Sequence, residues 1–170
     1  SLTNLDLNRN KITDISGLAK LTGLTVLDLN YNKIMSVLPL KILTSLRHLD
    51  ISHNQITDIS GLAKLTRLTR LWVYDNEIIS VLPLANLTSL TDLYLSRNQI
   101  TDISGLAKLT GLTHLDLFKN QITNILPLQS LSSMKYLDLG SNSIKTVLPL
   151  QSLTHLQSLG IYDNPINKRD

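Results

Sequence analysis

Residues 24–45 read LTVLDLNYNKIMSVLPLKILTS, and this pattern recurs along the whole chain at a fixed spacing of 22 residues. Apolar residues occupy positions 1, 4, 6, 11, 14, 17 and 20 of the unit, and an asparagine occupies position 9. The asparagines are Asn10, Asn32, Asn54, Asn76, Asn98, Asn120, Asn142 and Asn164. A chain that repeats one short unit in this way is expected to fold as a solenoid, in which each repeat packs on its neighbours.

The repeats follow one another without a linker. Seven full repeats start at residues 2, 24, 46, 68, 90, 112 and 134, and a partial repeat starts at 156. Residues 1–170 are therefore expected to form a single domain. Because Leu2 already belongs to the first repeat, we expect the chain to be a fragment that lacks its N-terminal cap. An uncapped edge would favour end-to-end self-association.

Each repeat divides into a strand and a return segment. The alternation around positions 4 and 6 predicts a short strand with its leucines inward, and about eight such strands would form a concave parallel sheet. The return segments carry Ser-Gly-Leu-Ala-Lys in repeats one, three and five, and Leu-Pro-Leu in the others. Glycine or proline at this position, and only about a dozen residues, predict short 3₁₀ or irregular turns on the convex side.

The phrase ITDISGLAKLT at residues 56–66 carries a family resemblance. It is similar to a phrase of bacterial internalins, which usually have proline where Gly61 stands, and the whole frame resembles the 22-residue class of leucine-rich repeats. The leucine-rich regulatory subunit of protein phosphatase 1 is also similar. The resemblance implies an α/β solenoid wound as a right-handed superhelix. It also implies a protein partner, since both groups bind proteins.

Composition excludes several classes of function. The chain has no cysteine, which rules out disulfides and thiolate metal sites, and no apolar run long enough to span a membrane. No phosphate-binding loop, metal-ligand doublet or catalytic triad is present, so we expect no enzyme activity, metal or cofactor. Three histidines near aspartates, His48, His53 and His114, leave an acid–base pair open.

Four rows of side chains are expected to line the concave face, at positions 3, 5, 7 and 8 of the repeats. All seven aromatic residues fall in these rows: Tyr31, Trp72, Tyr74, Tyr94, Phe118, Tyr136 and Tyr162. The alternative explanation for this placement is that aromatic residues favour strands, without any role in binding. The rows hold eight acidic and four basic residues, a net charge of −4 against +3 for the whole chain. An acidic aromatic face argues against nucleic acid as the partner.

We expect the central repeats to bind a protein, because tryptophan, tyrosine and arginine cluster there as they do in interface hot spots. The expected partner-binding residues are Arg70, Trp72, Tyr74, Asp92, Tyr94, Arg97, His114, Asp116, Phe118 and Tyr136. Asp6, Asp28 and Asp50 lie on successive repeats, where they are either plain solvated carboxylates or a site for a cation or a basic patch of the partner. The asparagines at position 9 are expected to be structural.

Three settings fit these observations. The favoured one is a non-catalytic binding module of a bacterial surface or secreted protein, as the internalin resemblance implies. The others are a regulatory or scaffolding subunit that docks on an intracellular enzyme, and the repeat region of a larger enzyme. The partner's identity, the organism and the compartment cannot be read from these residues.

Overall fold

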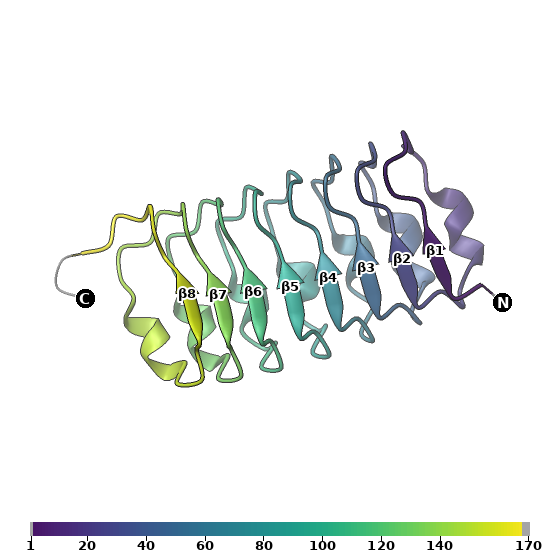
Figure 1. Cartoon of the computed structure of the whole chain (residues 1–170). Helices are drawn as coiled ribbons and strands as arrows, with labels where there is room; N and C mark the ends of the chain where they lie inside the picture. The colour runs from purple at the N-terminus through teal and green to yellow at the C-terminus, as the bar shows by residue number, and fades with distance from the viewer. Residues whose placement is uncertain (1, 168–170) are drawn as a thin grey trace.

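The computed structural model describes residues 2–167, which form one parallel sheet backed by short 3₁₀ segments (Figure 1). The sheet has eight strands in sequence order: β1 (Asn4–Asp6), β2 (Val26–Asp28), β3 (His48–Asp50), β4 (Arg70–Trp72), β5 (Asp92–Tyr94), β6 (His114–Asp116), β7 (Tyr136–Asp138) and β8 (Ser158–Gly160). The 3₁₀ segments are η1 (Ser16–Lys20), η2 (Leu38–Ile42), η3 (Ser60–Leu62), η4 (Leu82–Leu84), η5 (Ser104–Leu106), η6 (Leu126–Ser130) and η7 (Leu148–Ser152). The predicted leucine-rich-repeat solenoid is confirmed.

Every strand pairs with the next in the same register, so residues 22 apart lie side by side; Trp72, for example, pairs with Tyr94. Backbone hydrogen bonds continue past the strand ends, as from Leu29 N to the Asp50 carbonyl at 2.8 Å. The constant register turns each repeat position into a straight row of side chains. Parallel neighbours in such rows are about 4.8 Å apart.

The apolar frame fills the space between the sheet and the 3₁₀ segments. Leu27 and Leu29 from the strand side meet Ile34 and Leu40 from the return segment, and all four are buried. A buried side chain of this size contributes roughly 2 kcal/mol. Since each leucine packs between the repeats on either side, this stabilisation belongs to the array.

The asparagines at position 9 connect the backbones of adjacent repeats. Asn76 shows the arrangement: its side-chain nitrogen donates to the carbonyls of Ile51, Val73 and Tyr74 at 3.1–3.3 Å. Its side-chain oxygen accepts the N–H of Ile56 at 3.0 Å. One nearly buried amide thus satisfies four backbone groups at the bend after the strand, where neither strand nor helix bonds are available.

The residue just before each asparagine has a left-handed backbone, with φ between 51° and 55°. The eight residues are Arg9, Tyr31, His53, Asp75, Arg97, Lys119, Ser141 and Asp163. None is a glycine, although a side chain costs roughly 1–2 kcal/mol in this conformation. The sequence gives no compositional sign of this turn, since arginine, tyrosine and histidine all occur there. The left-handed residue directs the following asparagine inward.

Glycine in the return segments has a packing reason. A Cβ placed on Gly61 would lie 2.7 Å from the carbonyl carbon of Val37 and 2.9 Å from Cα of Leu38, in the preceding repeat. A Cβ on Gly105 would likewise lie too close to the backbone of Val81 and Leu82 in the repeat before it. A repeat with Ser-Gly therefore sits closely on the Leu-Pro repeat before it. The alternation produces a second period of 44 residues.

Candidate functional site

The side chains at positions 3, 5, 7 and 8 lie on the exposed side of the sheet, which we call the sheet face. It corresponds to the concave face expected from the sequence. The ten residues expected to bind a partner all lie here, on or beside β4 to β7, and none is fully buried. Nine of them lie in rows three, five and seven, and Arg97 lies in row eight beside Phe118 of row seven.

The centre of the sheet face is a stacked aromatic pair. The rings of Trp72 and Tyr94 are parallel within 1°, with centroids 5.8 Å apart. Both side chains are half-buried, and burial raises the pKa of the Tyr94 hydroxyl, with a smaller contribution from the carboxylate of Asp92. The pair offers a flat, rigid apolar surface in the middle of a polar face.

A second group runs along row three. The Arg70 guanidinium lies 3.6 Å from the carboxylate of Asp92, whose other oxygen lies 3.4 Å from Nδ1 of His114. The His114 ring in turn stacks on Tyr136, with centroids 4.5 Å apart. Thr91 also donates to Asp92 at 2.6 Å. Side-chain contacts thus run without a break across four successive repeats, from Arg70 to Tyr136.

A third group lies in row seven and extends beyond the expected residues. Tyr162 lies over Gly140, where a Cβ would be 2.7 Å from the ring, and so approaches Phe118 two repeats away at 5.8 Å. The guanidinium of Arg97 lies over the Phe118 ring, 5.9 Å from its centroid. Row seven was expected to point outward, yet its small members Ser52, Ser96 and Gly140 are buried. They are small enough for neighbouring side chains to cover them.

The structure also brings together residues that the sequence analysis did not select. Arg9 lies over the Tyr31 ring at 4.8 Å, and Tyr31 stacks on His53 at 3.9 Å. The His53 ring meets the edge of Tyr74 at 5.0 Å, and its Nδ1 lies 2.5 Å from the carboxylate of Asp75. Except for Tyr74, these residues belong to row eight, where the left-handed backbone aligns the side chains along one edge of the sheet face.

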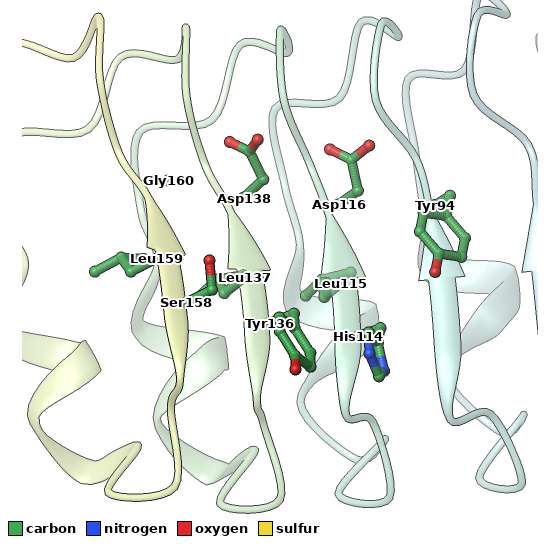
Figure 2. Close-up of a pocket in the computed structure, with 10 residues that line it drawn as sticks. All are labelled: Tyr94, His114, Leu115, Asp116, Tyr136, Leu137, Asp138, Ser158, Leu159 and Gly160. Carbon is green, nitrogen blue, oxygen red and sulfur yellow. The ribbon is translucent and has the colours of Figure 1, made fainter.

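Two shallow hollows flank the central aromatic pair. The N-terminal hollow, of about 240 Å³, is lined by Val26, Leu27, Asp28, His48, Asp50 and Trp72. Figure 2 shows the C-terminal hollow, of about 260 Å³, which is lined by Tyr94, His114, Leu115, Asp116, Tyr136, Leu137, Asp138, Ser158, Leu159 and Gly160. The expected binding residues therefore include much of the C-terminal hollow, but only Trp72 from the N-terminal one.

The aspartates of row five are held by their own backbone. In five repeats the carboxylate accepts the N–H two residues on, at 2.8–3.0 Å; these are Asp6, Asp28, Asp50, Asp116 and Asp138. Burial raises the pKa of Asp28 and of Asp116 despite these bonds, and the carboxylate of Asp50 or Asp138, respectively, adds to the effect. The folded chain therefore disfavours the ionised form of both carboxyl groups.

Residues 2–167 contain no group of three side chains suited to hold a metal ion, and none of their helices is long and apolar enough to cross a membrane. Of the three histidines that left an acid–base pair open, His53 and His114 lie beside aspartates. Both pairs stand on an open face with their rings stacked on tyrosines.

Three bacterial proteins are among the known structures that resemble this chain. A family model of leucine-rich repeats in two copies matches residues 1–41, 44–87 and 88–130. Internalin C2 of Listeria monocytogenes is 38% identical, with a TM-score of 0.92 over 94% of this chain and 71% of its own. Internalin InlF of that species is 34% identical, with a TM-score of 0.62 over 98% and 62%.

A leucine-rich-repeat protein of Leptospira interrogans is 25% identical, with a TM-score of 0.89 over 98% of this chain and 50% of its own. No curated protein sequence matches. The repeat frame, the fold and the identity to two internalins agree: the chain belongs to the leucine-rich-repeat family and is internalin-like.

Proposed function

We propose that the chain is a non-catalytic protein-binding module whose sheet face grips a folded partner, within an internalin-like surface or secreted protein of a bacterium. The observation that carries the proposal is the placement of the aromatic residues. All seven lie on or at the edge of the sheet face, and five of them, with two histidines, form ring contacts from repeat to repeat. The other two are the central pair, Trp72 and Tyr94.

The ten residues named from the sequence remain the proposed contact set, with Trp72 and Tyr94 at its centre. Their rings are already aligned, so little side-chain entropy is lost on binding. Large aromatic surfaces surrounded by polar residues are typical of interface hot spots. End-to-end association through the edge of β1 stays a separate prediction, to be checked by sedimentation at several concentrations.

The test is capture of a partner protein from cell extracts by this chain, followed by measurement of its affinity for the captured protein. Trp72→Ala should weaken its binding by at least about 2 kcal/mol, a thirtyfold rise in Kd. The melting temperature should change little, because Trp72 lies outside the apolar core. Lys64→Ala, on an exposed side chain of the convex side, is the matched control and should bind as the unaltered chain does. Equal affinities of all three proteins would contradict the proposal.

A further inference from the structure

The two hollows of the sheet face share one construction. Row five begins Asp6, Asp28, Asp50, Trp72, Tyr94, Asp116 and Asp138, so the two aspartates nearest to the aromatic pair are Asp28 and Asp50 on one side and Asp116 and Asp138 on the other. Each hollow holds two carboxylates from adjacent strands, one ring of the central pair as a wall, and one histidine from row three. The sheet face therefore presents the same chemistry twice.

Among the described residues, the only basic side chain that lines either hollow is a histidine, and neither lining includes a lysine or an arginine to balance the two carboxylates. The hydrogen bonds from the backbone fix each carboxylate without neutralising it. Burial still raises the pKa of Asp28 and Asp116, so a positive charge placed nearby would be favourable for both. An aromatic ring beside a carboxylate adds attraction for a cation, best of all for a guanidinium.

We propose that the partner inserts one cationic side chain, arginine or lysine, into each hollow, while the segment between them crosses the rings of Trp72 and Tyr94. This inference rests on the proposed function, since it names the chemistry of the partner that binds the sheet face. The net charge of −4 on the four rows complements a basic partner. The same charge disfavours nucleic acid and anionic membranes.

The strand register sets the spacing of the two cations. The Asp28–Asp50 pair is centred four strands from the Asp116–Asp138 pair, which corresponds to about 19 Å at the usual strand spacing. An extended chain advances about 3.3 Å per residue, so two basic residues six positions apart would reach both hollows. The residues between them face the aromatic pair, where small or apolar side chains fit.

Trp72 is the only tryptophan and forms a wall of the N-terminal hollow, which makes its fluorescence a local reporter. The probe is the heptapeptide Arg-Thr-Val-Thr-Val-Thr-Arg, blocked at both ends, and its match carries citrulline in place of both arginines. The arginine peptide should produce a saturable change that weakens as salt is added. The citrulline peptide should bind at least about tenfold more weakly, since only the charge-assisted bonds are lost.

Substitution of the aspartates tests whether both hollows contribute to the affinity for the arginine peptide. Asp28→Asn with Asp50→Asn, and separately Asp116→Asn with Asp138→Asn, should each weaken the arginine peptide about tenfold. Asparagine can still accept the backbone N–H, so the fold should be kept, which melting curves verify. The matched control is Asp58→Asn with Asp102→Asn: these convex aspartates also accept an N–H two residues on, and the charge change is equal. It should leave the affinity unchanged.

The outcomes separate the two proposals. Equal binding of both peptides, or loss of binding in the convex control as large as in the hollow variants, would overturn the cationic assignment. The absence of any response to the arginine peptide would do the same, while capture of a Trp72-dependent partner would still uphold the proposed function. Concentration-dependent sedimentation that the hollow variants abolish would instead identify the basic side of a second copy as the occupant.

Discussion

Alanine at Gly61 and at Gly17 should have opposite effects on stability, although both glycines stand in the same phrase, Ser-Gly-Leu-Ala-Lys. A methyl group at Gly61 would overlap the backbone of Val37 and Leu38 by roughly 0.5 Å or more, since ordinary contacts begin near 3.4 Å. The obstacle is backbone of the preceding repeat, which cannot move without separating two repeats. Overpacking of this kind costs about 1–3 kcal/mol. At Gly17 a Cβ meets nothing within 4 Å.

The expected result is a loss of about 1–3 kcal/mol for Gly61→Ala and a gain of about 0.4–1 kcal/mol for Gly17→Ala, because alanine restricts the unfolded chain. Gly105→Ala should resemble Gly61→Ala, since its Cβ would lie 2.6 Å from the carbonyl oxygen of Val81. Urea unfolding followed by circular dichroism measures all three. If Gly61→Ala and Gly17→Ala shift the midpoint equally, the close packing of Ser-Gly repeats on Leu-Pro repeats is not a source of stability.

Four further substitutions test other parts of the structure by the same unfolding measurement. Asn76→Ala should cost about 3 kcal/mol, because it strands buried backbone groups, whereas Asn10→Ala should cost far less, because the exposed Asn10 bonds only to the carbonyls of Leu7 and Asn8. Asp116→Asn should stabilise the fold at pH 7, since its raised pKa means that the folded state disfavours the ionised carboxyl; the advantage should vanish as the pH falls toward 3.8, and a constant difference would refute it. Ser141→Gly should stabilise by about 1 kcal/mol by relieving a φ of 53°; no gain would show that this backbone is not strained.

The repeat fold could be predicted from the sequence because every repeat carries the same pattern of apolar residues and asparagine. Leu27 and Leu29 indicate the strand, Asn32 the bend and Ile34 the return segment in one repeat, and seven more repeats agree. The left-handed backbone at the bend could not be predicted in the same way. The left-handed residue before each asparagine varies from Tyr31 to Ser141, because the backbone at that position is set by the pairing of neighbouring repeats and not by local preference.

The rows of the sheet face followed from the same period, and so did the adjacency of Trp72 and Tyr94. Several side-chain contacts within the rows did not. The stack of Tyr31 on His53 depends on how side chains leave a left-handed backbone, and Tyr162 reaches Phe118 only because Gly140 leaves room. Asp28 and Asp50 were singled out from the sequence, but the hollow that they form with His48 and the Trp72 ring was not, because its walls depend on how side chains from three adjacent strands lie.

The dependence of Gly61 and Gly105 on the Leu-Pro repeat before them bears on how such a chain can lengthen or shorten during evolution. Unequal recombination that removes one repeat would leave a glycine behind the wrong neighbour, whereas removal of two restores every junction. The near-identity of residues 11–22, 55–66 and 99–110, each 44 residues from the next, is what copying in pairs would leave behind. The heritable unit of this solenoid would then be the pair of repeats, and its sheet face would gain or lose side chains two strands at a time.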